Sequence, residues 1–477
     1  SMHSKTDFFI DGAWVKAHSD QALSVINPTT EEVIETISLG NETDLNLAVA
    51  AAKKAQAEWS ETSVAERKAL LERLLDIYKT KMDDMAEVIS LEMGAPIALA
   101  KTAQAGAGYG HLRQTIKTLE TFEFVTHVTK KDGIDNVFHE AVGVVGLITP
   151  WNWPMNQVML KVAPALAAGC SVVLKPSEIA PLSSMLLTEM IEEAGFPKGV
   201  FNLVNGDGAG VGTWLTKHPD VAAISFTGST RAGRLIMQSA SEHVKPICLE
   251  LGGKGANIIF ADADEKAVGR GVRQCFLNSG QSCNAPTRML VEESMYASAV
   301  EQAHEMANKT MVGLAHEEGR HIGPVASATQ YEKVQSLISR GIAQGAKLVC
   351  GGEGRPDGFA KGYFVKPTVF ADVTPEMDIF REEIFGPVLS IIPFKDQEHA
   401  IELANDTPYG LTNYVQTGDV DRARHLARKL KSGMVEVNGQ LLSPASPFGG
   451  VGLSGVGREG GIWGLEEFLY SKAVSGI

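Results

Sequence analysis

The sequence predicts an α/β protein in which two regions each contain a parallel sheet. Between Ala141 and Phe260, strand-like runs that are apolar throughout alternate with helical segments. Such strands are typical of βαβ units, whose helices bury both faces of a parallel sheet. A second alternation follows from Asp262 to Asn438. Residues 122–140 alternate weakly around Lys130-Lys131-Asp132-Gly133 and predict an extended hairpin, which is either a surface feature or an arm that pairs with a partner subunit.

Before the hairpin, the pattern predicts short strands followed by long helices. Asp11-Gly12 is a hairpin turn signal between two apolar runs, and Asn27-Pro28 marks a second turn before another short strand. Apolar residues recur at helical spacing from Asp44 to Leu91, and a further helix is expected in the Ala-rich stretch from Ile97 to Glu120. These apolar stripes are expected to be core.

The two α/β regions resolve into individual elements. In the first, the expected strands are Val142–Ile148, Ser171–Leu174, Val200–Val204, Val221–Phe226 and Ile258–Phe260. The expected helices there are Pro154–Ala168, Pro181–Ala194, Val211–His218 and Ala232–Ala240. In the second, the expected strands are Arg288–Val291, Leu348–Cys350, Phe364–Phe370, Val388–Phe394 and Met434–Asn438. Its expected helices are Tyr296–Thr310, Gln330–Gln344, Gln397–Ala404 and Val420–Lys431, and a last strand is expected at residues 468–470.

The composition limits the classes of partner that the protein can bind. With 477 residues and 44% hydrophobic content, the chain can bury a large core. Its formal net charge of −14 argues against a nucleic-acid-binding surface, although helix N-termini and single lysines can still hold an anionic cofactor. The longest plain apolar run near the middle, Ala141 to Ile148, is too short to cross a membrane. We therefore expect no nucleic acid and no membrane among the partners.

The cysteine pattern predicts reduced thiols and no metal site. The five cysteines form no C-x-x-C pair and no Cys/His cluster at metal-ligand spacing. No signal-peptide apolar region follows Ser1-Met2, which resembles the remnant of a removed tag. Reduced thiols are the default in the cytosol, so we expect a cytoplasmic protein.

Cys283 is the candidate nucleophile. It lies within N-S-G-Q-S-C-N-A-P-T-R, residues 278–288, with no apolar residue on either side. A buried structural cysteine normally has apolar neighbours, whereas a nucleophilic thiol needs access and nearby N–H groups. These residues by themselves leave both interpretations open.

Two further segments carry groups that such a thiol could use. Asn152 lies between two tryptophans and two prolines, which predicts a rigidly held amide donor of the oxyanion-hole type; an ordinary turn Asn is the alternative. Glu250 ends an apolar strand, where burial would raise its pKa toward neutrality and suit it as a general base; a structural ion pair is the alternative.

The phosphate-binding signals are indirect. Residues 206–212 are Gly-rich but miss the G-x-G-x-x-G spacing. Phe226-Thr227-Gly228-Ser229 ends a strand and opens a helix, so the N–H groups of Gly228 and Ser229 could be free for a pyrophosphate. Lys175 and Glu178 follow another strand and could hold an adenosine ribose, unless they form only a solvated charge pair. The carboxylate would repel a 2′-phosphate, which favours NAD over NADP.

Together the motifs resemble one family. They are T-P-W-N-W-P (149–154), K-P-S-E (175–178), F-T-G-S (226–229), E-L-G-G-K (250–254), G-Q-S-C (280–283), E-E-I-F-G-P-V (382–388), N-D-T-P-Y-G-L (405–411), P-F-G-G (447–450) and S-G-V-G-R-E (454–459). From Phe8 to Tyr470 the chain resembles the aldehyde dehydrogenase superfamily, of the non-phosphorylating, hydrolytic kind. The resemblance implies a Rossmann-like parallel-sheet NAD-binding domain (1–121 and 141–252) and an α/β catalytic domain (253–468). It also implies a small β oligomerisation arm (122–140 and 469–477), and so a homodimer or homotetramer.

The resemblance also implies a role for each matching residue. Cys283 matches the catalytic nucleophile, Glu250 the general base and Asn152 the oxyanion-hole amide. Glu459 matches a second acid that is sometimes assigned to proton relay. The residues expected at the cofactor are Ile148, Thr149, Pro150, Trp151, Lys175, Ser177, Glu178, Gly208, Phe226, Gly228, Ser229, Leu251, Glu383 and Phe385. The residues expected along the substrate tunnel are Trp153, Leu160, Ser282, Asn284 and Phe448, with Met159 beside Leu160.

The implied reaction is oxidation of an aldehyde to a carboxylic acid with NAD+ and water, through a thiohemiacetal and a thioester on Cys283. NADP is a less favoured cofactor. A coenzyme-A-acylating enzyme is an alternative that the presence of Glu250 disfavours, because such relatives generally lack that residue. A catalytically silent binding member is disfavoured because Cys283 and Glu250 are both present. The motifs do not name the aldehyde.

Overall fold

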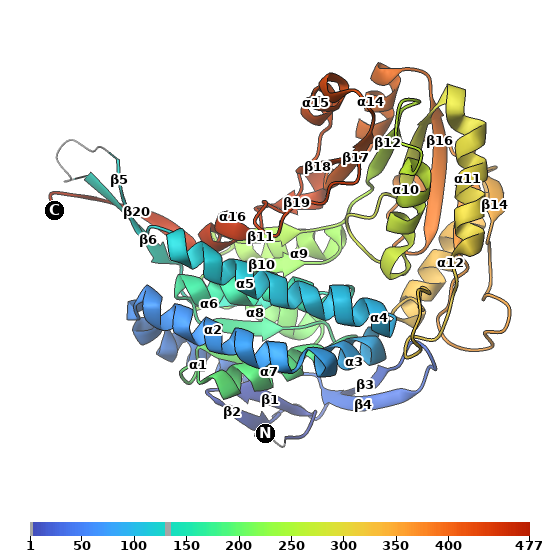
Figure 1. Ribbon diagram of the computed structural model, residues 1–477. Coiled ribbons are helices and arrows are strands. Elements are labelled where there is room, and N and C mark those ends of the chain that lie inside the picture. The colour runs from blue at the N-terminus through green and yellow to red at the C-terminus, as the bar shows by residue number, and fades with distance from the viewer. Residues whose placement is uncertain (1–2, 129–134) are drawn as a thin grey trace.

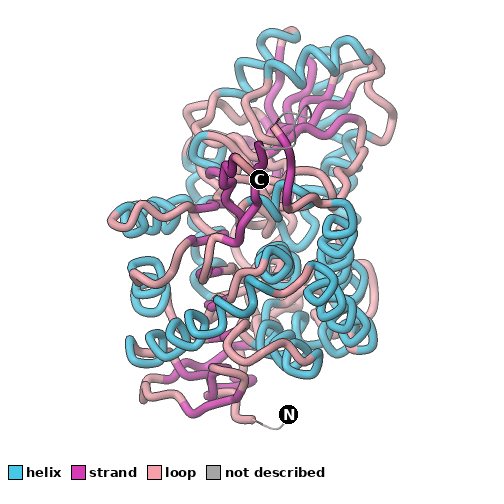
Figure 2. The backbone as a smooth tube through the Cα atoms, turned by 90° about the vertical axis from the view of Figure 1, so that its left-hand side faces the viewer, coloured by secondary structure: helices cyan, strands magenta, loops and turns pink. Residues whose placement is uncertain are grey.

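The computed structural model describes residues 3–128 and 135–477, and it confirms the α/β class (Figure 1). Two large sheets, each flanked by helices, form the body of the protein, and a thin three-stranded sheet extends from it (Figures 1 and 2). The Lys130–Gly133 turn of the expected hairpin lies outside the described residues. No helix in the described part of the chain is long and apolar enough to cross a membrane.

The first sheet has eight strands in the order β19-β11-β10-β7-β8-β9-β1-β2. Its strands are β1 (Asp7–Ile10), β2 (Ala13–Lys16), β7 (Val145–Ile148), β8 (Val172–Lys175), β9 (Phe201–Leu203), β10 (Ala223–Thr227), β11 (Ile247–Glu250) and β19 (Gly455–Val456). The five strands from β11 to β9 are parallel, and antiparallel strands close both edges. The carboxyl ends of the parallel strands therefore meet at one edge, where such sheets bind ligands.

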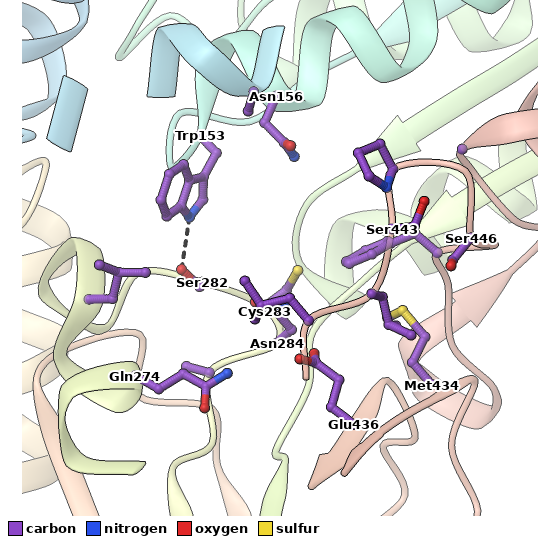
Figure 3. Close-up of a pocket in the computed structure, with 18 of the residues that line it drawn as sticks. Trp153, Asn156, Gln274, Ser282, Cys283, Asn284, Met434, Glu436, Ser443 and Ser446 are labelled. Carbon is purple, nitrogen blue, oxygen red and sulfur yellow. Dashed lines mark hydrogen bonds between the residues drawn. The ribbon is translucent and has the colours of Figure 1, made fainter. Parts of the chain in front are cut away.

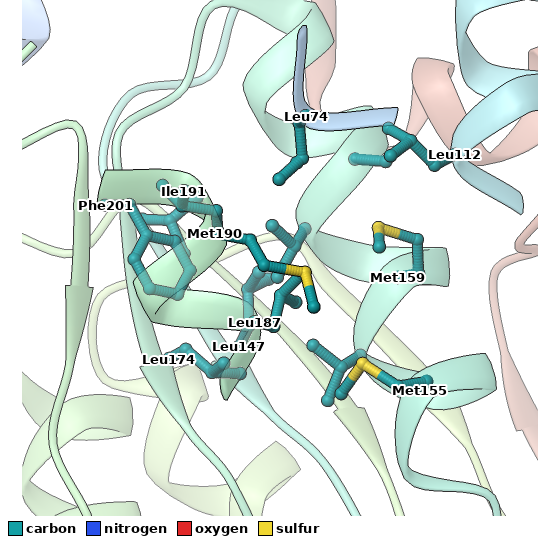
Figure 4. Close-up of a cluster of buried hydrophobic side chains, with 14 of the residues drawn as sticks. Leu74, Leu112, Leu147, Met155, Met159, Leu174, Leu187, Met190, Ile191 and Phe201 are labelled. Atoms are coloured by element: carbon teal, nitrogen blue, oxygen red, sulfur yellow. The ribbon is translucent and has the colours of Figure 1, made fainter. Parts of the chain in front are cut away.

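Helices cover both faces of this sheet, as the apolar strands require. One face carries α2 (Val64–Thr80), α3 (Met82–Met93), α5 (Ala105–Thr121), α6 (Pro154–Ala168) and α7 (Leu182–Ala194). The other carries α1 (Glu42–Glu61), α8 (Thr213–Lys217) and α9 (Thr230–Ser241). Alternate residues of one strand pack on the two faces: Leu174 packs toward α6 and α7 (Figure 4), and Val173 belongs to the cluster on the α1 face. Met159 is fully buried in the α6–α7 layer, where truncation to alanine typically costs about 2–5 kcal/mol.

The second sheet has seven strands in the order β14-β15-β16-β13-β12-β17-β18. They are β12 (Ala256–Ile259), β13 (Arg288–Glu292), β14 (Lys347–Cys350), β15 (Thr368–Ala371), β16 (Val388–Phe394), β17 (Thr412–Gln416) and β18 (Met434–Val437). Helices α10 (Ala267–Phe276) and α11 (Tyr296–Lys309) cover one face. Helices α12 (Ala328–Ala343), α13 (Asp378–Arg381), α14 (Gln397–Asn405) and α15 (Val420–Lys429) cover the other.

Two strand expectations in these sheets are corrected. The apolar run at Ile258–Phe260, expected in the first region, forms β12, which pairs with β13 and β17 in the middle of the second sheet. Strand β17 was not expected at all. The expected strand Val142–Ile148 is also shorter, because Gly143 adopts a positive φ of 126° and β7 begins only at Val145.

The hairpin segment joins the end of the chain. Strand β6 (Asp135–Ala141) pairs antiparallel with β5 (Val125–His127) on one side and with β20 (Leu469–Ser475) on the other. The pairing with β20 extends from Leu469 opposite Ala141 to Ser475 opposite Asp135. This sheet extends away from the body, with the C-terminus near its tip (Figure 1).

Several short elements complete the fold. Strands β3 (Ala22–Ile26) and β4 (Val33–Ser38) form a ribbon, and α4 (Ile97–Leu99) leads through a π-helical turn, η1 (Ala100–Gln104), into α5. Near the end of the chain, β19 pairs with β11, and α16 (Gly461–Glu466) packs on α5 and α6. This segment therefore contributes to the first sheet, although its residues lie in the range expected for the catalytic domain.

Candidate active site

The loop that carries Cys283 connects η3 (Leu277–Gly280) to β13. Asn278 and Ser279 adopt left-handed backbone angles, with φ of 55° and 58°, which turn the chain sharply out of α10. Burial raises the pKa of the Cys283 thiol, with smaller contributions from the charges of Glu383 and Glu250; the backbone N–H groups of Cys283 and Asn284 oppose the rise. The thiol is therefore protonated at neutral pH in this state, and nucleophilic attack requires that its proton be removed.

Asn152 lies directly against this loop, after β7. Its side chain is 3% exposed, and its Nδ2 donates to the Gln281 carbonyl at 3.2 Å. Its own carbonyl accepts from Gln104 Nε2 at 3.1 Å and from Asn278 Nδ2 at 2.9 Å. The expected amide donor is thus next to the thiol loop, and its backbone is held by two buried amides that the sequence did not single out.

Glu250 ends β11 and is 1% exposed. Neither of its carboxylate oxygens has a hydrogen-bond partner within the described residues. Burial, followed by the charge of Glu459, raises its pKa well above the usual value, which is the direction expected from the sequence. A Cβ on Gly449 would lie 2.8 Å from Glu250 Oε1, so a glycine at this position leaves room for the carboxylate. The raised pKa makes the Glu250 carboxylate a stronger base than an exposed glutamate.

A buried ion pair lies behind Glu250. Lys161 Nζ donates to Glu459 Oε2 at 2.9 Å and to Ser225 Oγ at 2.8 Å. Lys161 is fully buried on α6, and Glu459 is 3% exposed. The sequence pointed to Glu459 but not to Lys161. The positive charge of Lys161 opposes the rise in the Glu250 pKa, so the pair is electrostatically linked to that carboxylate.

Three charged residues are expected at the cofactor. Lys175 and Glu178 lie at the carboxyl end of β8 in the first sheet, and Glu383 lies just after α13 of the second region. Lys175 Nζ lies 3.3 Å from Glu178 Oε2, and burial lowers the pKa of Lys175 while Glu178 opposes this. Glu383 Oε2 accepts from the Gly253 N–H at 2.8 Å, and burial raises the Glu383 pKa. The Phe385 ring meets Trp151 edge-on at 5.6 Å between centroids.

The pyrophosphate expectation for Gly228 is wrong in part. The Gly228 N–H is not free, because it donates to the Glu250 carbonyl at 3.0 Å as the β10–β11 pairing continues. Ser229 caps α9, with its Oγ accepting from the Ala232 N–H at 3.2 Å. Because Ser229 accepts from the N–H groups of Ala232 and Gly233, the first-turn donors of α9 that remain are the N–H groups of Thr230 and Arg231.

Other groups at the same edge suit a dinucleotide. The hydroxyls of Thr149 and Thr227 are buried without a hydrogen-bond partner in the described residues. A Cβ on Gly208 would meet no atom within 4 Å, so open space borders that glycine. Ser177 is buried beside Lys175, while Ile148, Pro150, Phe226 and Leu251 line the same strand ends. Unpaired hydroxyls and a free helix N-terminus fit a ligand that carries both ribose and phosphate groups.

A cavity of about 550 Å³ opens onto Cys283 (Figure 3). All five residues expected along the tunnel lie on its wall: Trp153, Leu160, Ser282, Asn284 and Phe448. Trp153 Nε1 donates to Ser282 Oγ at 2.8 Å, which ties the Asn152 segment to the thiol loop. Met159 does not reach the cavity, because it points into the core from the opposite side of α6.

The cavity wall also includes residues that the sequence did not single out. His111 and Asn156 come from α5 and α6, and Tyr414 and Glu436 come from β17 and β18. They belong to no motif, and only the pairing of distant strands brings them together. The site therefore combines a thiol on the cavity wall, an amide that donates to the thiol loop and a buried carboxylate whose charge acts on the thiol. This set of groups suits an α/β enzyme that acts on a carbonyl group.

Comparison with known proteins identifies the family. The aldehyde dehydrogenase family model matches residues 14–474. A Pseudomonas 3-succinoylsemialdehyde-pyridine dehydrogenase is 51% identical, over 100% of this chain and 99% of its own length. The crystal structure of a Bartonella henselae aldehyde dehydrogenase is 57% identical, with a TM-score of 0.98 over 99% of this chain and 100% of the other. A Pseudomonas syringae aldehyde dehydrogenase C mutant, solved with NAD+ and octanal, is 44% identical, with a TM-score of 0.97 over 100% and 97%. The chain belongs to the aldehyde dehydrogenase family.

Proposed function

We propose that this aldehyde dehydrogenase oxidises an aldehyde to its carboxylic acid with NAD+ and water, through a covalent intermediate on Cys283. The proposal is carried by Cys283 on the cavity wall, by Asn152, whose Nδ2 donates to the Gln281 carbonyl of the thiol loop, and by Glu250, whose charge acts on the thiol. Each supplies a group that acyl chemistry on a carbonyl needs: a nucleophile, an oxyanion donor and a base.

The first step is addition of the thiol to the aldehyde. Cys283 loses its proton to the buried carboxylate or to water, and its sulfur forms a bond to the carbonyl carbon. The carbonyl oxygen then becomes an oxyanion, for which the Asn152 amide and the Cys283 N–H are the donors. Asn152 Nδ2 at present donates to the Gln281 carbonyl, so this donor must turn from Gln281 toward the oxyanion.

The cofactor proposal rests on the residues at the sheet edge. Lys175 and Glu178 would hold the adenosine ribose, the α9 N-terminus with Ser229 the pyrophosphate, and Glu383 the nicotinamide ribose. NAD+, when bound, accepts the hydride that leaves the tetrahedral carbon. Structural relatives of this chain from Pseudomonas syringae and Bacillus cereus were solved with NAD+. The Glu178 carboxylate disfavours the 2′-phosphate of NADP.

The last step releases the acid. Glu250 takes a proton from water, and the resulting hydroxide adds to the thioester carbon. The carbon–sulfur bond then breaks, the carboxylic acid leaves, and the Cys283 sulfur is free for another turnover. Overall, aldehyde, NAD+ and water become acid, NADH and a proton. The raised pKa of Glu250 supports this role, because a carboxylate with a higher pKa is a stronger base toward water.

We also propose a location and an assembly. Reduced, unpaired cysteines support a cytoplasmic enzyme. The β20-β6-β5 sheet is the proposed oligomerisation arm of a homodimer or homotetramer, because it leaves strand edges beyond the body of the subunit. The proposed domain division is 1–121 with 141–252 for NAD binding, 253–468 for catalysis, and 122–140 with 469–477 for the arm.

Stopped-flow NADH measurements test the mechanism. Cys283→Ala is expected to form no NADH from any aldehyde, and Glu250→Gln is expected to give a burst of NADH near one per active site followed by a slow steady state. Cys350→Ala is the matched control, because Cys350 lies on β14 and does not line the cavity, and we expect full turnover from it. NADH formation by Cys283→Ala, or a full-rate steady state in Glu250→Gln, would contradict the assignments.

A further inference from the structure

The charges around the substrate cavity are unevenly paired. Arg270 lines the cavity, but its guanidinium binds both carboxylate oxygens of Asp264, at 3.0 and 2.8 Å, and also Gln416 at 2.6 Å. His111 shares a 2.7 Å hydrogen bond with Asn156, and burial lowers the His111 pKa, so that ring is neutral near pH 7. Both of these groups are therefore satisfied by the protein itself.

Glu436 differs from them, because no described residue forms a hydrogen bond or an ion pair with its carboxylate. It is 7% exposed, its Oε1 is buried without a hydrogen bond, and it takes part in no ion pair among the described residues. A buried carboxylate without a donor is unfavourable, and natural proteins seldom retain one without a use. Burial is the cause that raises the Glu436 pKa, which is the direction expected for a carboxylate that lacks a cation nearby.

The strand geometry points Glu436 into the cavity. On β18, Met434 and Glu436 line the cavity, whereas the alternate residues Val435 and Val437 pack against the core on the other face. Figure 3 shows the Glu436 carboxylate directed toward the open space beside Cys283 and Asn284. The carboxylate is thus presented to whatever occupies the cavity.

Its place in the sheet relates it to the nucleophile. Glu436 lies opposite Tyr414 in the β17–β18 register, and the Tyr414 hydroxyl donates to the carbonyl of Asn284, the neighbour of Cys283. Glu436 therefore lies on β18, the strand next to the one whose tyrosine contacts the thiol loop. Because Tyr414 donates to a backbone carbonyl, it does not connect Glu436 to the thiol as a proton path. The cavity wall also includes the apolar residues Leu441, Leu442 and Phe448.

This inference rests on the proposed function. We propose that Glu436 is a specificity-determining residue that favours aldehydes with a cationic nitrogen at the end remote from the carbonyl, and that it disfavours aldehydes that end in a carboxylate. The reacting carbonyl would lie at Cys283, the carbon chain against the apolar wall, and the cation against the Glu436 carboxylate. Because the Glu436 carboxylate is buried, it attracts opposite charges and repels like charges more strongly than it would in water.

Three aldehydes of similar length test the proposal with NAD+ in excess. They are 4-(trimethylammonio)butanal, its uncharged isostere 5,5-dimethylhexanal, and the anionic 5-oxopentanoate. For the unaltered enzyme we expect kcat/KM for the cation to exceed that for its isostere by about tenfold or more, and the anion to be the poorest substrate. In Glu436→Gln, which keeps the side-chain shape, the cation-to-isostere ratio is expected to fall to about one.

Met434→Leu is the matched control, because it alters the shape of the same wall without changing its charge, and we expect it to leave the cation-to-isostere ratio near that of the unaltered enzyme. Thermal unfolding gives a readout independent of turnover: Glu436→Gln should raise the midpoint without ligand, since a buried unpaired carboxylate is removed. The inference is overturned if the cation-to-isostere ratio is the same in Glu436→Gln as in the unaltered enzyme. It is also overturned if Glu436→Gln lowers the midpoint temperature of unfolding. If the unaltered enzyme oxidises none of the three aldehydes, the proposed function fails instead.

Discussion

Replacing Lys161 with methionine tests how the buried charges behind Glu250 work together. Lys161 Nζ contacts Glu459 Oε2 at 2.9 Å and Ser225 Oγ at 2.8 Å, and both members of the ion pair are almost completely buried. Methionine has a similar length and keeps the apolar packing of α6. Removing one member of a buried ion pair leaves an uncompensated charge, which costs about 3–5 kcal/mol. The free energy of unfolding of Lys161→Met, measured by denaturant titration, should fall by that amount.

The same substitution should alter the pH dependence of turnover. Burial and the charge of Glu459 raise the Glu250 pKa, and the charge of Lys161 opposes that rise. Without Lys161, the Glu250 pKa rises further, so the carboxylate is available as a base only at higher pH. The rising limb of the steady-state rate against pH should therefore move to higher pH in Lys161→Met.

Two companion variants make the reasoning refutable. Ser225→Ala removes only a neutral acceptor of Lys161, so its expected cost is about 1 kcal/mol, with little movement of the pH limb. The double variant Lys161→Met/Glu459→Gln removes the orphaned charge and should recover most of the lost stability. If Lys161→Met lowers the free energy of unfolding by less than about 1 kcal/mol, or if the double variant regains none of that loss, Lys161 and Glu459 do not stabilise the fold as an ion pair.

Three other substitutions probe separate parts of the protein. Asn152→Ala removes an oxyanion donor and should lower kcat by about 10²–10³-fold in steady-state assays, with an intact thermal transition as the check on folding. Glu178→Ser removes the carboxylate that would oppose a 2′-phosphate and should raise the NADP+/NAD+ ratio of kcat/KM by about tenfold; an unchanged ratio would contradict the ribose assignment. Glu92 is fully buried and accepts from the N–H groups of Leu182 and Ser183, yet burial raises its pKa to about 7. An acid whose pKa is raised on folding contributes stability at low pH and loses it as pH rises from about 4.5 through about 7. Relative to Glu92→Gln, the unaltered enzyme should therefore lose about 3 kcal/mol across that range, and parallel pH curves for the two proteins would refute the assignment.

Hydrophobic pattern predicted most strands but not the sheet to which each belongs. Ile258–Phe260 reads as a buried strand, and β12 is one, but an apolar run carries no information about its neighbours. Strand β17 was missed because T-N-Y-V-Q is largely polar. Two of its polar side chains form hydrogen bonds inside the sheet: Asn413 Oδ1 accepts from the Ala256 N–H, and Gln416 Nε2 donates to Asn257 Oδ1. Hydrophobic patterns do not reveal buried polar strands, because the hydrogen-bond partners that make their burial possible are distant in sequence.

The sequence likewise pointed to some residues of the candidate site and missed others. Short motifs identified Cys283, Asn152 and Glu250, because each motif combines a reactive group with the local backbone that presents it. The motif around Gly228 suggested a free N–H, but β11 lies beside it and its Glu250 carbonyl accepts that hydrogen bond. Lys161 was missed because a lone lysine in an apolar helix reads as a solvated or snorkelling side chain; its partner lies 298 residues away.

The positions of Asn152 and Cys283, the proposed oxyanion donor and nucleophile, depend on a third segment that carries no motif. Gln104 ends a π-helical turn, and its Nε2 bridges the Asn152 carbonyl and Asn278 Oδ1, both at 3.1 Å. Asn278 in turn donates to the carbonyls of Asn152 and Gln281, and its left-handed backbone starts the thiol loop. The π-turn adds a residue to a helical turn and so offsets Gln104 from a regular helical position. Because this one amide contacts both the Asn152 segment and the Cys283 loop, their relative position follows from the π-turn as well as from the two motifs.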